Sequence, residues 1–322
     1  MWRACIFVGF FVIYFPGNQG IIHPMWTSRY IRSMAARTLL SHLAEAQNNR
    51  TNEIDLTEWY YDDIRSLPED LHAKFIQSDL DEETREFLQN SCDKSDAVFT
   101  QFGHMLFKGL TGLFMSVTTM NGILNRGSMF VFSNAQFRTL LGMDVNDKRK
   151  RLLDLGAGDG KVTEMMAPYF EEVYTTEQSP AMRWRLHWKG YKVLEIDKWS
   201  NVDDPYDVIS CLNLLDRCDK PLSILRDAKN ALKPSTGRLV IAVVLPFSPC
   251  VESGRSLVTP TEQITLSGKT WGEQVASLVQ DVFTPAGFAV ECFSKVPYLC
   301  EGDLYENFYV LSDAVFVLKP AD

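Results

Sequence analysis

A glycine-rich turn between an apolar run and a helix constrains this sequence more than any other feature. Leu152 to Gly160 reads LLDLGAGDG, with glycines at alternate positions, and a helical pattern begins at Lys161. Glycine lets the backbone turn sharply and approach a ligand closely, and the start of the helix offers free N–H groups. From Lys150 onward, strand-like and helix-like segments alternate, which predicts a doubly wound parallel α/β sheet that binds ligands beyond the carboxyl ends of its strands.

The expected strands are short apolar runs, and the expected helices separate them. Arg238–Leu245 is almost wholly apolar, as a central strand of a parallel sheet should be. The other strands are expected at Arg151–Asp154, Glu172–Thr176, Tyr191–Ile196, Tyr206–Leu212, Ala289–Val296 and Ala314–Leu318. The helices are expected at Lys161–Phe170, Pro180–Trp188, Pro221–Leu232 and Trp271–Ala286.

A helical extension is expected before this sheet. From Trp59 to about Met120, apolar residues that include Phe75 and Ile76 recur at intervals of three and four, which is typical of helices.

Ser133, with Gln136 three residues later, predicts a capping box at the start of a short helix.

These patterns divide the chain into three parts. They are a leader and linker (residues 1–52), a helical extension that packs on the catalytic domain (residues 53–148) and the α/β domain (residues 149–322).

The leader has the features of a targeting sequence. Residues 4–15 form an apolar run after Arg3, which suits the core of a signal peptide and is short for a transmembrane span. No clean cleavage site follows, so an uncleaved segment that associates with a membrane is the alternative. Residues 26–44 contain arginine and no acid, which resembles a mitochondrial transit sequence. We expect targeting to the secretory pathway and the endoplasmic reticulum, with the mitochondrion as the alternative; the sequon Asn49-Arg50-Thr51 is compatible with the former.

Charge and cysteine usage argue against two kinds of partner. The formal net charge is −9, and an acidic surface does not attract a phosphate backbone, so no nucleic-acid partner is expected. The seven cysteines form no CxxC pair, and none of the five histidines lies at a metal-ligand spacing from another histidine or cysteine. We therefore expect neither a metal site nor a disulfide framework.

The glycine spacing separates two classes of cofactor. A dinucleotide-binding turn reads G-x-G-x-x-G, and its third glycine would fall at position 161, which is lysine. Here the glycines are Gly156, Gly158 and Gly160, with Asp154 two residues before the first. This D-x-G-x-G-x-G pattern resembles motif I of class I methyltransferases and implies S-adenosyl-L-methionine as cofactor. A carboxylate at the strand end suits the ammonium of that cofactor and would repel a pyrophosphate.

Two further segments supply candidate polar groups. Glu177 follows the second strand, where an acid can accept hydrogen bonds from ribose hydroxyls; alternatively, it is only an acid near a helix N-terminus. Asn213 and Asp216 lie in the loop after the fourth strand, which in this fold faces the methyl group of the cofactor. The alternative for Asp216 is that it merely pairs with Arg217 or caps a helix.

Four strings resemble the DREV family, also called methyltransferase-like protein nine, which are protein histidine methyltransferases. They cover residues 126–133, 152–160, 209–219 and 297–303, and the similarity extends from about residue 55 to the end. The resemblance implies methyl transfer to the pros nitrogen of histidine in His-x-His motifs of proteins and peptides, where x is small.

The resemblance also implies roles for individual residues. Glu177, Asn213 and Tyr298 match positions that contact the cofactor, whereas Asp216 and Tyr309 match positions at the substrate imidazole. We expect both tyrosines between the last two strands, where a loop can cover the site; without the resemblance, the alternative of two ordinary loop tyrosines would be preferred. Arg126 and Ser128 lie in a shared string without an assigned role.

Neutral imidazole is already a nucleophile, so the enzyme chiefly has to select a nitrogen. A carboxylate such as Asp216 that accepts the tele N–H fixes the tautomer in which the pros lone pair is free. Two alternatives remain: a methyltransferase of a small molecule or of another protein side chain, and a cofactor-binding scaffold without catalysis.

Overall fold

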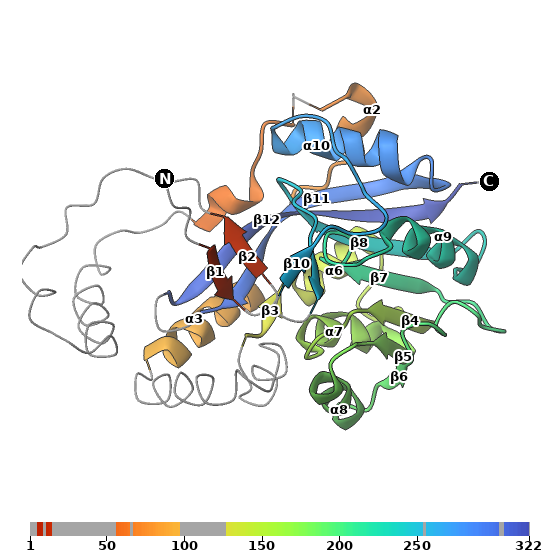
Figure 1. Ribbon diagram of the computed structural model, residues 1–322, viewed down its shortest axis with the longest axis horizontal. Coiled ribbons are helices and arrows are strands. Elements are labelled where there is room, and N and C mark those ends of the chain that lie inside the picture. Colours follow the sequence, from red (N-terminus) through yellow and green to blue (C-terminus); the bar gives the residue numbers. More distant parts are fainter. Residues whose placement is uncertain are drawn as a thin grey trace, which may run out of the picture. The chain divides into compact units, whose positions relative to one another are not determined.

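An eight-stranded sheet organises the fold (Figure 1). The computed structural model describes residues 5–8, 11–14, 56–64, 67–96, 127–253, 256–302 and 306–321. The strands of the sheet lie in the order β3-β11-β12-β8-β7-β4-β5-β6. They are β3 (Met129–Phe130), β4 (Arg149–Leu155), β5 (Phe170–Thr176), β6 (Lys192–Leu194), β7 (Val208–Leu212), β8 (Arg238–Val244), β11 (Phe288–Glu301) and β12 (Phe308–Pro320).

The sheet is mixed rather than wholly parallel. The strands β6, β5, β4, β7 and β8 run parallel to one another, as predicted. In contrast, β12 runs antiparallel to β8, with Asp313 opposite Val244. Only residues 302–307 separate β11 from β12, which is too few for the crossover helix that a parallel connection requires. The expectation of a parallel sheet is therefore wrong for the last strand.

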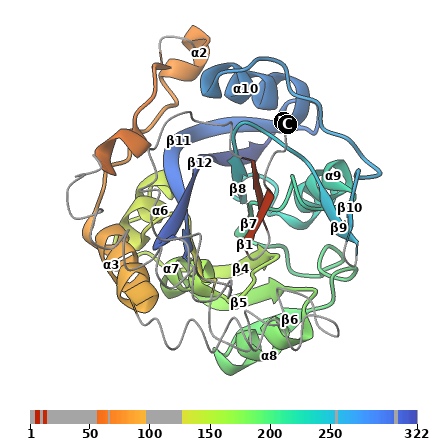
Figure 2. The ribbon, with the colours of Figure 1, turned by 60° about the vertical axis from the view of Figure 1, so that its left-hand side comes forward.

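The helices follow the sequence pattern closely. They are α6 (Asn134–Leu141), α7 (Lys161–Met166) continued by the 3-10 turn η4 (Ala167–Tyr169), α8 (Pro180–Trp188), α9 (Pro221–Ala231) and α10 (Trp271–Ser277) continued by the π-helical η5 (Leu278–Phe283). The capping box of α6 is confirmed, because the Ser133 side chain accepts the Gln136 N–H and the Gln136 side chain accepts the Ser133 N–H. Figure 2 shows the curl of the sheet, with α10 beside β11 and α8 beside β6.

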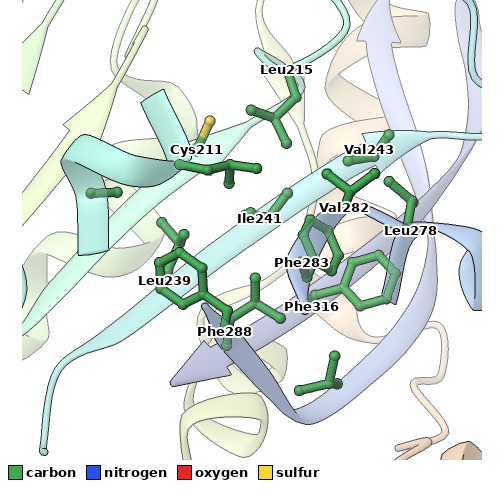
Figure 3. Packing of buried hydrophobic residues seen from close by; sticks show 14 of the residues in the cluster. Cys211, Leu215, Leu239, Ile241, Val243, Leu278, Val282, Phe283, Phe288 and Phe316 are labelled. Atoms are coloured by element: carbon green, nitrogen blue, oxygen red, sulfur yellow. The ribbon is translucent and has the colours of Figure 1, made fainter. Parts of the chain in front are cut away.

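A large apolar core lies on one face of the sheet, between β7, β8 and β12 and the helices α9, α10 and η5 (Figure 3). Phe316 of β12 is fully buried and meets Phe283 of η5 edge to face, with ring centroids 5.1 Å apart. Phe293 of β11 stacks on Phe316 at 5.7 Å. Such aromatic pairs add stabilisation beyond the area that they bury, so this core holds the central strands and their exit loops in place.

The segment before α6 contains less helix than predicted. It forms η2 (Leu56–Tyr60), α2 (Glu69–His72) and α3 (Glu82–Asp96), whereas residues 97–126 lie outside the described residues. Phe75 and Ile76, which we assigned to a helix, are extended: Phe75 forms a bridge with Phe293, and the Ile76 N–H donates to the Phe293 carbonyl at 2.8 Å. The Phe75 ring also packs edge-on against Trp271. Tertiary packing onto β11 therefore overrides the helical periodicity here.

The contacts of the chain group it into two compact units. One unit comprises residues 56–86, 128–299 and 310–322, and the other comprises residues 1–55, 87–127 and 300–309. The predicted boundaries at residues 52 and 148 stay predictions. In the unit that contains residues 1–55, β1 (Cys5–Val8) pairs antiparallel with β2 (Phe11–Tyr14). In the unit that contains residues 128–299, β9 (Val251–Ser253) pairs antiparallel with β10 (Ser256–Val258). Of the helices described, none is both long and apolar enough to cross a membrane.

Candidate active site

The carboxyl ends of three neighbouring strands bring the predicted residues to one edge of the sheet. Leu155 at the end of β4 pairs with Thr176 of β5 on one side and with Cys211 of β7 on the other. The residues that follow these strands therefore lie next to each other: the glycine-rich turn after β4, Glu177 after β5 and Asn213 after β7. This edge is where open α/β sheets bind their ligands.

The turn adopts backbone conformations that favour glycine. Gly156, Gly158 and Gly160 all have positive φ angles, of 70°, 56° and 76°. The Gly156 N–H donates to Thr176 Oγ1 at 3.2 Å, which ties the turn to β5. A Cβ built on Gly158 meets no atom of the described residues within 4 Å. The turn is thus fixed by its neighbours and has open space at its middle glycine, as a ligand-binding turn requires.

Glu177 is linked directly to this turn. Its side chain is 6% exposed; one oxygen accepts the Gly158 N–H at 3.0 Å and the other accepts the Ser179 N–H at 2.8 Å. Burial raises the pKa of Glu177 above its ordinary value, although these backbone hydrogen bonds act in the opposite direction. An ionised carboxylate has about four acceptor positions. The two N–H groups therefore leave capacity for hydroxyl donors of a ligand.

Asp154 has a structural connection that the sequence did not reveal. Its carboxylate is 2% exposed and accepts hydrogen bonds from Thr163 Oγ1 at 2.6 Å and Ser210 Oγ at 2.7 Å. Burial raises the pKa of Asp154 to about 6. Asp154 thus joins β4 to α7 and β7 directly below the turn. Its predicted contact with the cofactor ammonium stays a prediction.

Asn213 occupies a strained position at the end of β7. It is the non-glycine residue with positive φ among the described residues, at 52°, and its N–H donates to the Ala242 carbonyl at 2.9 Å. Its side-chain Nδ2 donates to Asp313 Oδ2 at 2.7 Å. The remaining amide atom, Oδ1, is buried and has no hydrogen-bond partner in the described part of the chain.

Asp216 forms the ion pair that the sequence offered as the alternative, and its role at the substrate stays a prediction. Its Oδ2 lies 3.2 Å from Arg217 Nε, so the predicted alternative of an ion pair is observed. Its Oδ1 is nevertheless buried without a hydrogen bond to any described residue. Burial raises the pKa of Asp216 to about 6, and Arg217 lowers it in part. The carboxyl group is therefore ionised at neutral pH and keeps one acceptor oxygen available.

Asp313 was not singled out from the sequence. It is fully buried on β12, and burial, reinforced by Asp216, raises its pKa well above the ordinary value. Its Oδ1, like those of Asn213 and Asp216, has no partner among the residues described. The only sequence signal was an acid immediately before the apolar run Ala314–Leu318.

The two predicted tyrosines lie in strands, so their assignment to a loop is wrong. Tyr298 belongs to β11 and Tyr309 to β12, and each is 4% exposed. The Tyr298 hydroxyl contacts the Met129 sulfur of β3. The connection between the two strands is shorter than the sequence pattern suggested, because both strands extend beyond their expected bounds.

Ser128, which had no assigned role, contacts the glycine-rich turn. Its hydroxyl donates to Asp159 Oδ2 at 2.6 Å, and Asp159 Oδ1 accepts the Lys161 N–H at 3.0 Å. Asp159 therefore links the segment before β3 to the start of α7. Arg126 lies outside the described residues.

The donor and acceptor set fits S-adenosylmethionine. Glu177 keeps acceptor capacity beside the turn at the end of β5, and Asn213 Oδ1 is an acceptor that no described residue satisfies. No cluster of three or more histidine, cysteine or acidic side chains suited to a metal ion occurs in the described ranges. The expectation that the chain has no metal site stays a prediction.

Comparison with known proteins identifies the type of domain. The sequence model of a family described as "DREV methyltransferase" matches residues 59–320, which is most of the chain. A solved S-adenosylmethionine-dependent methyltransferase from Clostridium acetobutylicum is similar, with a TM-score of 0.38 and 13% identity, over 70% of this chain and 99% of its own. One from Leishmania major, of the DUF858 family, has a TM-score of 0.39 and 14% identity, over 58% of this chain and 71% of its own.

Proposed function

The chain belongs to the DREV methyltransferase family and uses S-adenosylmethionine, and on that premise we propose that its acceptor is histidine in protein substrates. The methyl group would go to the pros nitrogen in His-x-His motifs with a small x, as the family resemblance implies. The observation that carries this proposal is the buried Oδ1 of Asp216, which has no hydrogen-bond partner among the described residues and which the resemblance places at the imidazole.

The residues that would hold the cofactor surround the glycine-rich turn. Glu177 would accept the ribose hydroxyls, while Gly156 and Gly158 let the backbone pass close to the ligand. Asn213 and Tyr298 complete the contacts, and Asp154 supports the turn from below. When bound, S-adenosylmethionine supplies a methyl group attached to a positively charged sulfur.

Asp216 would select the nitrogen that reacts. A neutral imidazole carries a proton on one nitrogen and a lone pair on the other. If Asp216 Oδ1 accepts the tele N–H, the pros nitrogen is left with the lone pair. That lone pair would form the new N–C bond as the bond between methyl and sulfur breaks, with the electron pair of the broken bond staying on the sulfur. The ring would become positively charged as that bond forms, and the adjacent carboxylate would stabilise the charge, as carboxylates do for catalytic histidines. Loss of the tele proton through Asp216 to water would then give neutral methylhistidine. Catalysis would then consist mainly of positioning and of tautomer selection, with Tyr309 as the second residue at the imidazole.

A transfer assay with labelled cofactor tests the proposal. Purified protein is incubated with a His-Ala-His peptide, an Ala-Ala-Ala peptide of the same flanks and a mixture of small-molecule acceptors. We expect label in the first peptide alone, on the pros nitrogen. Label in small molecules or in the histidine-free peptide would support the alternative substrate classes. Binding of the cofactor with no acceptor at all, in a panel of peptides, would support a scaffold.

We also propose that the leader directs the chain to the secretory pathway, as its apolar run and the sequon at Asn49 suggest. Glycosidase treatment of the protein from secretory cells should then increase its gel mobility, and Asn49→Gln should abolish that increase. Import into isolated mitochondria with loss of the leader would instead support the alternative.

A further inference from the structure

Asp313 and Asn213 reach each other across the end of a central strand. Asp313 lies on β12 directly opposite Val244 of β8. On the other side of β8, Leu212 of β7 pairs with Ala242, and Asn213 follows it. The 2.7 Å hydrogen bond between the two side chains therefore spans β8 at the edge of the sheet where the site is built.

This hydrogen bond determines how the Asn213 amide is oriented. An asparagine side chain has a donor end and an acceptor end, and Asp313 Oδ2 takes the donor end. The acceptor end, Oδ1, must then point away from Asp313, and no described residue satisfies it. Buried polar atoms are almost always paired. The unpartnered oxygen of Asn213 and that of Asp216, three residues along the same loop, therefore indicate acceptors that serve a ligand.

We propose that Asp313 is a positioning residue of the methyltransferase site, which holds the Asn213 amide so that its carbonyl oxygen is presented to the cofactor. This inference rests on the proposed contact of Asn213 with the cofactor. It is independent of which acceptor receives the methyl group.

The ionisation state of Asp313 follows from its surroundings. Burial and the negative charge of Asp216 both favour the neutral form of Asp313, and the hydrogen bond from Asn213 opposes this only in part. The positive charge of Arg217 lies against Asp216, with Nε 3.2 Å from Asp216 Oδ2. A neutral carboxyl group still accepts a hydrogen bond and places no second negative charge beside Asp216. Asparagine has the shape of a neutral carboxyl group and keeps an acceptor oxygen. We therefore expect asparagine at position 313 to hold the Asn213 amide as aspartate does.

Three variants test this role through the affinity for S-adenosylhomocysteine, measured by calorimetry without any peptide. Asp313→Val removes the acceptor and places an apolar, β-branched residue, which suits a buried strand, at this position. Asp313→Asn keeps the acceptor. The control, Ser294→Ala, removes another buried hydrogen bond, which joins the hydroxyl of Ser294 on β11 to that of Ser78 at 2.8 Å. We expect Kd to rise about tenfold in Asp313→Val and less than threefold in the other two variants, as loss of one oriented hydrogen bond allows.

A double variant separates positioning from a general loss of stability. If Asp313 acts through Asn213, then Asn213→Ala combined with Asp313→Val should bind no more weakly than Asn213→Ala alone. An unchanged Kd in folded Asp313→Val would overturn the proposal, as would additive losses in the double variant. The proposal would also be overturned if Asp313→Asn bound S-adenosylhomocysteine as weakly as Asp313→Val while thermal unfolding showed that both variants are folded. Failure of the histidine assay with these affinities as expected would count against the proposed substrate alone.

Discussion

Ser128 donates a hydrogen bond of 2.6 Å to Asp159 and so fastens the segment at β3 to the glycine-rich turn. The other oxygen of Asp159 accepts the N–H of Lys161, the first residue of α7. The turn is therefore held from outside by Ser128, from below by Asp154 and from the β5 side by Glu177. A turn fixed in this way is organised before its ligand arrives.

Replacing Ser128 with alanine should weaken cofactor binding with little effect on stability. The lost hydrogen bond, to a half-buried carboxylate, contributes about 1.5–3 kcal/mol. If about 1 kcal/mol of this must be spent on re-ordering the turn when the ligand binds, Kd rises about fivefold. Calorimetry with S-adenosylhomocysteine measures this. Ser78→Ala is the matched control, because it removes a serine hydrogen bond away from the turn. Equal affinities of the two variants would show that Ser128 does not position the turn.

Alanine at Gly158 should affect binding more than folding, whereas alanine at Gly160 should do the reverse. Both positions have positive φ, which costs an L-residue about 1–2 kcal/mol. The Cβ at position 160 would also lie 2.8 Å from Leu186 Cδ2, whereas at position 158 it enters open space beside the turn. Thermal unfolding and calorimetry on both variants compare the effects. A Gly158→Ala protein with unchanged cofactor affinity would mean that the ligand does not occupy this space.

The sequence predicted the local elements better than it predicted the contacts between them. The α6 capping box and the bounds of α8 depend on neighbouring residues, and both are confirmed. The contact of Asn213 with Asp313 joins residues 100 positions apart. The spacing of apolar residues along the chain predicts local elements and cannot predict a contact over such a separation. Phe75 illustrates the same limit, because its apolar spacing fits a helix while its packing against Trp271 and Phe293 requires an extended chain.

The pH dependence of methyl transfer should show two protonations. The pKa of Asp216 is raised to about 6 by burial, so this acceptor is lost as the pH falls below about 6. The substrate imidazole, with an ordinary pKa of about 6.5, loses its lone pair over the same range. We therefore expect kcat/KM on a His-Ala-His peptide to fall by about a hundredfold per pH unit below about pH 5.5. A tenfold fall per unit would mean that only one of the two groups must be deprotonated.

Acid unfolding through Asp216 or Asp154 does not explain such a loss. Both pKa values are raised above 3.8 in the folded protein, so burial of their charged forms opposes folding. Their contribution to stability is therefore greatest below about pH 4 and is lost as the pH rises through about 6. Thermal unfolding measured at each pH is the control, and it should show that the protein stays folded over the range in which kcat/KM falls.

The most direct test of tautomer selection is Asp216→Asn. The amide keeps the shape of the carboxyl group but has no negative charge and can present an N–H where the tele N–H of the substrate should be accepted. Cofactor affinity should barely change, because Glu177 and Asn213 remain. Turnover on a His-Ala-His peptide should fall about a hundredfold or more, as orientation effects of a few kcal/mol allow. The residual product should also show a weaker preference for the pros nitrogen, read by mass spectrometry and NMR.

Asp219→Asn supplies the control for Asp216→Asn. It makes the same change three residues away, at an exposed carboxylate that accepts hydrogen bonds from the Thr261 N–H and hydroxyl at 2.8 and 2.7 Å. Its turnover and its choice of nitrogen should match those of the unaltered protein. The acid limb of the pH profile should become a single protonation in Asp216→Asn only, since the substrate imidazole then titrates alone. Near-normal turnover with unchanged site choice in Asp216→Asn would mean that this carboxylate only pairs with Arg217, and that another residue, with Tyr309 the next candidate, sets the tautomer.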